Sequence, residues 1–162
     1  MLPTEQQKNL SSDGGVSSVA SFSFPRHERL HLKREIETLF REGERLFVFP
    51  YRFTYRVFAV PEGGGVAMMP IVPKRLFKHA VDRNLNKRRL RAAFRLQVGE
   101  LRTIAQQHQV MVHMSFLLIS NEKVDYARLH AAVGRLLQQV ALLVEKRAQK
   151  GLYRKDVDSP SL

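Results

Sequence analysis

The sequence contains no cysteine and no tryptophan, and acidic residues are scarce relative to basic ones. Without cysteine the chain forms no disulfide bond and offers no thiol nucleophile or thiolate metal ligand, a composition that fits a reducing cytoplasm. No apolar run approaches the roughly 18 residues that a membrane-spanning helix needs. The first residues also lack the basic start and apolar stretch of a secretion signal. We therefore expect a cytoplasmic protein with no membrane span.

Positive charge is abundant and unevenly distributed. The 162 residues include 27 Lys or Arg and 15 Asp or Glu, which gives a formal net charge of +12. The segment from Lys74 to Arg95 holds nine of the cations and one acid, so 22 residues supply +8 of that charge. Because like charges this close repel one another, the segment indicates a polyanionic partner, either nucleic acid or an anionic membrane surface.

The length suits one domain with ends of different composition. Residues 1–24 are rich in Ser, Gln and Gly and are predicted to form a disordered N-terminal extension. Residues 151–162 resemble them and are predicted to form a flexible C-terminal tail. The folded domain is expected to span residues 25–150.

Hydrophobic periodicity predicts a mixed α+β domain. A helix of about 15 residues is expected within residues 26–43, ending at Gly43. The aromatic and β-branched stretch 46–60 predicts strand, broken by Pro50, and a turn at 61–65 leads to a second strand at 66–72. A helix from Val81 to Val98, a buried strand at 109–120 and a long helix at 125–150 follow. The expected fold is a small two-layer sandwich in the order α-β-β(-β)-α-β-α.

The helix expected from Val81 to Val98 places its polar residues on one side. At about 100° per residue, Asn84, Lys87, Arg88, Arg91 and Arg95 fall within an arc of roughly 100°. Such a row of cations is suited to the phosphates of an RNA backbone, and the planar fork of Arg bonds phosphate oxygens in pairs. The alternative is an ordinary solvated helix face. The lack of acids one turn from the cations argues against it, since exposed helices usually mix charges of both signs.

The stretch KHAVDRNLNKRRLRAAFR resembles the signature of the bacterial ribonuclease P protein family, roughly K-x-A-V-x-R-N-x-x-K-R-x-x-R. Lys74 and Arg75 stand where that family has a basic pair after the preceding strand. The order of elements over residues 26–148 is similar as well. The signature positions are met by Lys78, Ala80, Val81, Arg83, Asn84, Lys87, Arg88 and Arg91.

The resemblance implies a protein subunit that assists a catalytic RNA in removing the 5′ leader of precursor tRNA. The RNA would hold the Mg²⁺ ions and carry out the hydrolysis, and the chain would act as a monomer in the holoenzyme without contacting a membrane. The family fold also implies a left-handed β-α-β crossover around the signature helix, against the general rule. The RNA-binding residues implied are Lys74, Arg75, Lys78, Arg83, Asn84, Lys87, Arg88, Arg91 and Arg95.

The resemblance further implies a cleft between the first helix and the sheet that holds the single-stranded leader. Alternation in the strand places aromatic rings on one face and Arg52, Thr54 and Arg56 on the other. Rings beside cations stack unpaired bases, although the same rings are equally suited to the core. The leader-binding candidates are Ile36, Phe40, Tyr51, Phe53 and Tyr55, with Tyr55 preferred because a phenol tolerates a half-wet face.

Three positions depart from the family pattern. The family often has a Gly just before the Ala80-Val81 pair, but this chain has none there and Phe77 is an apparent insertion. Arg89 occupies a position that is usually apolar, and Ile36 stands where an aromatic residue is common. Asn84 either contacts RNA or caps the helix, and Asp82 competes with it as the cap.

No catalytic or metal site of the chain's own is predicted. The six histidines are scattered and none pairs with an acid at a metal-ligand spacing such as H-E-x-x-H, and His113 is expected to lie in the core or on a sheet face. Two other functions stay open from the residues alone: a structural RNA-binding protein of the ribosomal type, and a DNA-binding regulator, which the lack of helix-turn-helix spacing disfavours. Cleavage of precursor tRNA at low Mg²⁺ separates them from a ribonuclease P subunit.

Overall fold

The computed structural model of the protein describes residues 24–153. Residues 1–23 of the predicted extension and residues 154–162 of the predicted tail lie outside the described residues. The elements in chain order are a short 3₁₀ turn η1 (Arg26–Glu28), α2 (Lys33–Glu42), β1 (Glu44–Val48), β2 (Tyr51–Ala59), β3 (Gly65–Ile71), α3 (Ala80–Gln97), α4 (Gly99–Gln107), β4 (Val110–Leu118) and α5 (Tyr126–Gln149).

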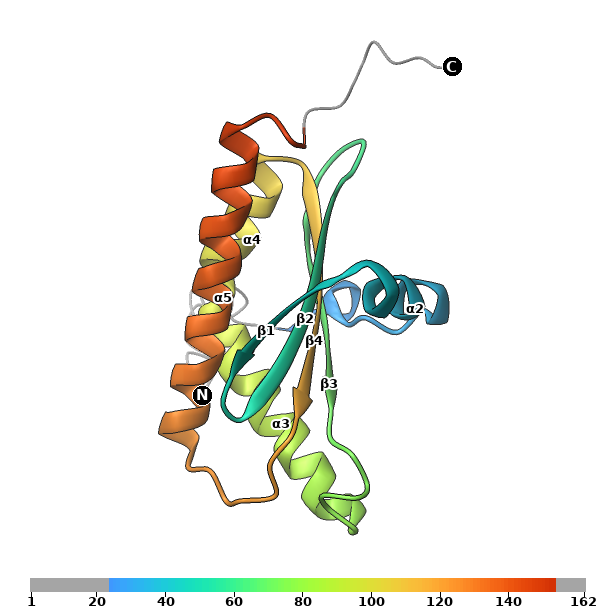
Figure 1. The fold of residues 1–162 in the computed structure, drawn as a ribbon, viewed down its shortest axis with the longest axis vertical. Helices are drawn as coiled ribbons and strands as arrows, with labels where there is room; N and C mark the ends of the chain where they lie inside the picture. Colours follow the sequence, from blue (N-terminus) through green and yellow to red (C-terminus); the bar gives the residue numbers. More distant parts are fainter. Residues whose placement is uncertain (1–23, 154–162) are drawn as a thin grey trace, which may run out of the picture.

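The strands form one sheet in the order β1-β2-β4-β3. The β1–β2 and β2–β4 pairs are antiparallel, whereas β3 and β4 are parallel neighbours joined through α3 and α4. These two helices and α5 cover one face of the sheet, and α2 lies alone on the other (Figure 1). The predicted α+β sandwich and its crossover connection are confirmed, while the left hand of the crossover stays a prediction.

Two helical predictions need correction. The first helix has ten residues instead of about 15, because Leu30 lies against the sheet in extended form, where its N–H donates to the Met68 carbonyl at 3.0 Å. The helix α4 was not predicted at all. Its buried Leu101, Ile104 and Ala105 have helical spacing, but the run has only nine residues, which is close to the shortest length that periodicity reveals.

The strand predictions hold in outline. Pro50 does divide the first stretch into a five-residue edge strand and a nine-residue strand, with a cis bond between Phe49 and Pro50. Gly43 ends α2 as expected and also permits a close approach to β2. A Cβ atom there would lie 2.8 Å from the Thr54 methyl group and 2.9 Å from the Tyr55 carbonyl oxygen. The end of α2 is thereby held over the middle of the sheet.

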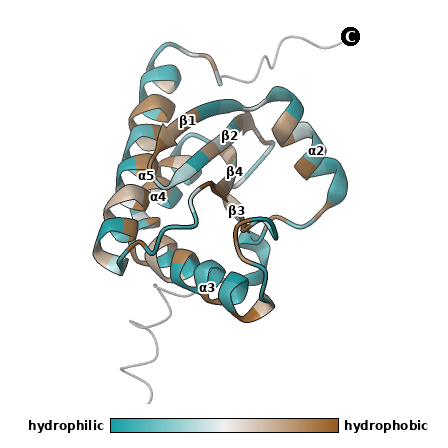
Figure 2. Cartoon of the chain, turned by 60° about the horizontal axis from the view of Figure 1, so that its bottom comes forward, coloured by the Kyte–Doolittle hydropathy of each residue, from teal (hydrophilic) through white to brown (hydrophobic). Residues whose placement is uncertain are grey.

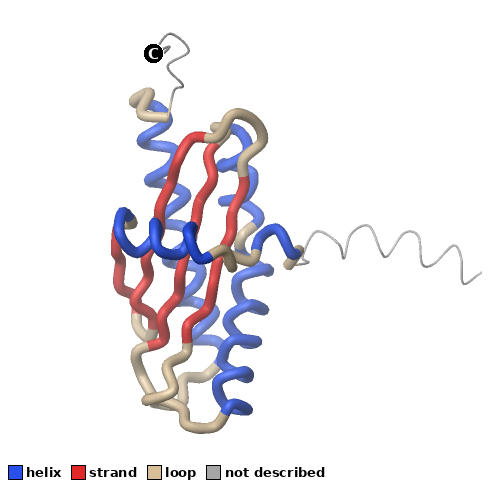
Figure 3. Tube along the Cα trace, turned by 90° about the vertical axis from the view of Figure 1, so that its right-hand side faces the viewer, coloured by secondary structure: helices blue, strands red, loops and turns tan. Residues whose placement is uncertain are grey.

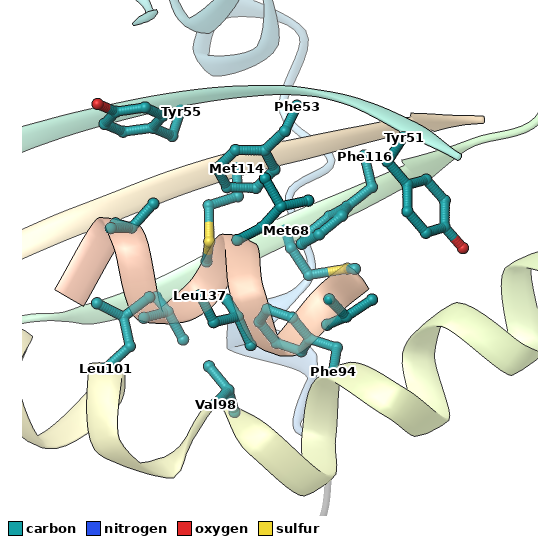
Figure 4. Packing of buried hydrophobic residues seen from close by; sticks show 14 of the residues in the cluster. Tyr51, Phe53, Tyr55, Met68, Phe94, Val98, Leu101, Met114, Phe116 and Leu137 are labelled. Atoms are coloured by element: carbon teal, nitrogen blue, oxygen red, sulfur yellow. The ribbon is translucent and has the colours of Figure 1, made fainter. Parts of the chain in front are cut away.

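The main core lies between the sheet and the layer of α3, α4 and α5. Phe53, Met114 and Phe116 point from the strands toward the helices, where Phe94 and Leu137 meet them (Figure 4). All five side chains are buried. A second, small cluster of Leu30, Leu39 and Ala67 holds α2 on the opposite face. Most of the buried apolar side chains therefore lie on one face of the sheet.

The segment before α2 is fastened across the helical layer. Phe24, placed in the extension by its sequence context, packs edge-on against Phe94 with ring centres 5.7 Å apart. The carboxylate of Glu28, 3% exposed, accepts two hydrogen bonds from the Arg102 guanidinium at 2.6 and 2.9 Å. We call residues 24–30 the N-terminal strap. Within the described range 24–153, no helix combines the length and apolarity needed to cross a membrane.

Candidate nucleic-acid interface

The helix α3 has two different halves. Its buried residues Leu90, Ala93 and Phe94 all lie in the second half. In the first half Val81 is 76% exposed and Leu85 is 44% exposed, so these turns project from the core. Most of the helix is hydrophilic on its surface (Figure 2). The basic segment is thus held firmly at one end and presented to solvent at the other.

Every predicted RNA-binding residue is accessible. Among residues 24–153, the ion pairs of the structure use other cations, so these side chains lack a carboxylate partner there. The side chains are half-exposed at Arg83, Lys87 and Arg91, and exposed at Lys74, Arg75, Lys78, Asn84, Arg88 and Arg95. The cations among them are available to phosphate groups, apart from Arg83, whose Nη1 already donates to two carbonyl oxygens.

Two arginines of the helix anchor loops. Arg83 donates to the carbonyl oxygens of Phe77 and Lys78 at 2.9 and 2.8 Å, which folds the loop before α3 back onto the helix. Arg89, at the usually apolar position, donates to the Val124 carbonyl at 2.6 Å and ties α3 to the loop before α5. The departure at Arg89 therefore has a structural use on the inner side of the helix, away from the cation arc.

The predicted cap at Asp82 is wrong. The helix begins at Ala80 with His79 in the cap position, and no side chain there accepts a capping hydrogen bond. Asn84 lies beyond the first turn and is exposed, so capping does not account for it either. A contact from Asn84 to RNA stays a prediction.

Arg91 brings the helix next to the N-terminal strap. Partial burial lowers the pKa of Arg91, and the positive charge of Arg29 on the strap lowers it further. The Arg29 guanidinium also lies over the Phe24 ring, 5.6 Å from its centre. Two cations from separate elements are therefore neighbours, a placement that an anion between them would stabilise.

The assignment of the strand aromatics to an accessible cleft is wrong. Tyr51, Phe53 and Tyr55 are 2%, 0% and 2% exposed and face the helical layer. The Tyr55 hydroxyl donates to Glu44 at 2.9 Å, and Glu44 also pairs with Arg147 of α5 at 2.7 Å. Burial and that hydrogen bond raise the pKa of Tyr55 to about 12. These rings belong to the core and have no free face for a base.

The other face of the sheet is open beside α2. Figure 3 shows that α2 crosses the strands near their middle and leaves the sheet uncovered on either side of it. On the side toward the loop that leads into α3, one register row crosses all four strands. We call it the open row; its members are Ile71, Leu117, Arg52 and Phe47. Phe47 is 58% exposed, Arg52 is exposed, and the other two are half-exposed.

The two leader-binding candidates on α2 lie on the side of the helix that borders this row. Glu42 on the opposite side pairs with Arg56 at 3.3 Å, which fixes the rotation of the helix. Ile36 and Phe40 are turned away from Glu42 by more than a quarter-turn at about 100° per residue. Phe40 is 38% exposed, and Ile36 is partly buried against the small cluster. Ile36 and Phe40 therefore lie beside the open row, and their contact with the leader stays a prediction.

Phe47 and Arg52 were missed as site residues by sequence reasoning. The alternation in residues 51–56 separated the rings from the cations but did not say which face meets the helices. A signal was present in the edge strand. The residues before Pro50 were predicted to form a short edge piece, and an edge strand is covered by a neighbouring strand on one side only. The pairing of Phe47 with Arg52 is a matter of register, which only the structure shows.

His113 is a core residue, as expected. It is 4% exposed, its ring meets the edge of Phe58 at 5.0 Å, and its Nδ1 has no hydrogen-bond partner. Burial lowers the pKa of His113, which Arg56 lowers further and Glu35 partly restores. In the part of the chain that the structure describes, no group of three or more His, Asp or Glu residues is placed to hold a metal ion.

Comparison with known proteins agrees with this geometry. The family model described as ribonuclease P matches residues 24–141. A ribonuclease P protein component from Porphyromonas gingivalis is 33% identical over 135 residues, covering 83% of this chain and 98% of that protein. The corresponding protein from Thermotoga petrophila is 33% identical over 120 residues, covering 73% of this chain and 96% of its own length.

Solved structures show the same fold. The ribonuclease P protein from Thermotoga maritima matches with a TM-score of 0.54 at 23% identity, over 69% of this chain and 96% of that one. The Staphylococcus aureus protein matches with a TM-score of 0.52 at 15% identity, over 70% and 94%. The chain belongs to the bacterial ribonuclease P protein family. Membership and fold support the role of a protein subunit of this tRNA-processing endoribonuclease, with an RNA partner in the holoenzyme.

Proposed function

We propose that the chain binds the catalytic RNA of ribonuclease P through α3 and holds the 5′ leader of precursor tRNA on the open row. A single cytoplasmic copy serves each holoenzyme and assists Mg²⁺-dependent removal of the leader. The observation that carries the proposal is the position of the open row between α2 and the cationic loop before α3. Ile71 is followed within a few residues by Lys74 and Arg75, so a strand of RNA on the row lies next to the cations.

Two kinds of contact divide the work. The arc of Lys87, Arg88 and Arg95 presents charge in a line, which suits a continuous row of phosphates in a folded RNA. The open row offers the Phe47 ring and the Arg52 guanidinium on a flat sheet, which suits unpaired bases, and each base stacked on an aromatic ring gains about 1–3 kcal/mol. The chain needs no nucleophile when its task is to position a substrate for an RNA catalyst.

Among residues 24–153, no cluster of acidic residues fits a magnesium site. Mg²⁺ prefers carboxylate and phosphate oxygens, and the acids near α3 are Asp82 in its first turn and Glu100 in the first turn of α4. The proposed role of the chain therefore involves no protein-bound Mg²⁺. Mg²⁺ stays with the partner RNA, and the chain contributes charge and position.

The test compares substrates with and without a leader. Holoenzyme carrying Phe47→Ala is expected to bind precursor tRNA about 5- to 150-fold more weakly, because a stacking contact is lost, and to bind mature tRNA normally. Arg52→Ala is expected to weaken precursor tRNA binding in the same direction. Truncating Phe47 leaves the core intact because the ring is 58% exposed. Arg34→Ala is the matched control, since Arg34 is an exposed cation on the side of α2 away from the sheet.

Two results would contradict the proposal. Equal ratios of precursor to mature tRNA affinity in wild type and in Phe47→Ala would remove the open row as the leader site. Unchanged leader cleavage by the catalytic RNA at low Mg²⁺, with or without the chain, would favour a structural RNA-binding protein with no part in cleavage.

A further inference from the structure

A hollow of about 440 Å³ lies between the end of the edge strand β1, with the turn that follows it, and the first half of α5. Phe47 and Phe49 line it from the strand side, and Arg128, Ala131 and Arg135 line it from the helix. Phe47 also ends the open row, so one exposed ring borders both surfaces. The edge strand β1 separates the open row from the hollow.

The hollow is cationic and aromatic. The Arg128 guanidinium lies over the Phe49 ring, 4.7 Å from its centre. Arg135 follows seven residues later on the same helix face, about 10.5 Å along the axis. No acid lines the hollow, and among residues 24–153 neither arginine forms a salt bridge. The nearby Asp125 carboxylate caps α5 by accepting the Arg128 backbone N–H at 2.9 Å. Two free guanidinium groups beside aromatic rings fit a phosphate-bearing chain whose bases stack.

The register of the sheet connects the hollow to the leader site. The open row runs Ile71, Leu117, Arg52, Phe47 from β3 to β1. With strands about 4.8 Å apart, four strands span about 14 Å. An RNA strand that enters beside the loop before α3 and crosses the row therefore reaches Phe47 and then the hollow. This continuity favours RNA over a protein partner as the occupant.

We propose that the hollow is a second subsite for the 5′ leader, which takes nucleotides farther from the cleavage site than those on the open row. Arg128 and Arg135 bind the phosphates there, and Phe47 at the edge stacks a base between the two subsites. The proposal rests on the proposed function, since it extends the path of the leader across the same sheet.

The experiment measures affinity against leader length. Holoenzyme binds precursor tRNAs whose leaders increase from about 2 to about 16 nucleotides, the upper range of single-strand sites on one small domain. Wild type is expected to gain affinity in two stages, the first from the open row and the second from the hollow. Arg128→Ala with Arg135→Ala is expected to abolish the second gain and keep the first. The salt slope for the longest leader should fall by about one unit per cation removed.

Control variants distinguish loss of the subsite from misfolding and from a general loss of charge. Both arginines are exposed, so the double variant should fold, as circular dichroism would verify. Arg135→Glu reverses charge in the hollow and should weaken long leaders further, while Lys146→Ala, near the other end of α5, should change nothing. A second gain that survives in the double variant, or a wild-type gain that ends with the first stage, would overturn the second subsite. If the affinity of wild type did not depend on leader length at all, the proposed function itself would be contradicted.

Discussion

We expect Arg102→Ala to destabilise the protein strongly, because it leaves a carboxylate buried without a partner. Glu28 is 3% exposed and Arg102 is 23% exposed, and their paired contact holds the N-terminal strap on α4. Removing one member of a buried pair costs about 3–5 kcal/mol, most of it the cost of desolvating the remaining charge. For a domain of this size the melting temperature should fall by roughly 10–20 °C.

Urea unfolding followed by circular dichroism measures the effect, with an unchanged slope showing that the unfolded state is comparable. Replacing both residues by Leu should restore most of the stability, since no charge then stays buried. Lys33→Ala is the control, because the Lys33–Glu37 pair is 4.0 Å apart with side chains 91% and 60% exposed. A loss within about 1 kcal/mol of wild type, the range of exposed pairs, would refute the reasoning and show that water reaches Glu28.

Two further predictions concern charge and pH. Arg88→Ala and Arg95→Ala should each lower the slope of log affinity against log salt for the catalytic RNA by about one unit, with Arg34→Ala as control; a flat salt dependence in wild type would contradict phosphate binding by α3. The pKa of Tyr55 is raised to about 12 by burial and by its hydrogen bond to Glu44, against about 10 in an unfolded chain. The phenol therefore adds stability below about pH 10 that is lost as the pH rises toward 12. Tyr55→Phe should lose less stability than wild type between about pH 9 and pH 12, and an equal loss would show that Tyr55 does not titrate this way.

The signature segment was readable from sequence because its information is local. The spacing of Lys87, Arg88 and Arg91 fixes a helix and one charged side whatever the rest of the chain does, and the structure has them accessible on α3. The break at Pro50 was local in the same sense, since proline fixes its own φ and has no backbone N–H. Gly43 is different, because the close approach of Thr54 and Tyr55 also requires a residue without a side chain there.

Which face of β2 packs against the helices could not be decided from local sequence. A strand that alternates rings and cations can bury either set, and one choice moves every side chain to the opposite side. The structure buries Tyr51, Phe53 and Tyr55 because α5 supplies apolar contacts and the Glu44–Arg147 pair that receives the Tyr55 hydroxyl. Those partners come from α5 and from β1, so no inspection of residues 51–56 alone would have identified them.

The sequence by itself determined the order of the elements, the cation arc and the family resemblance, because periodicity and fixed spacing are properties of neighbouring residues. The tertiary structure alone decided the inward direction of the strand aromatics, the open row that ends in Phe47, and the hollow shared by Phe49, Arg128 and Arg135. Each of these depends on strand register or on helix packing between residues far apart in the chain. The physical reason is that a surface for RNA consists of the side chains that packing does not bury. Which side chains are buried depends on contacts among residues throughout the chain.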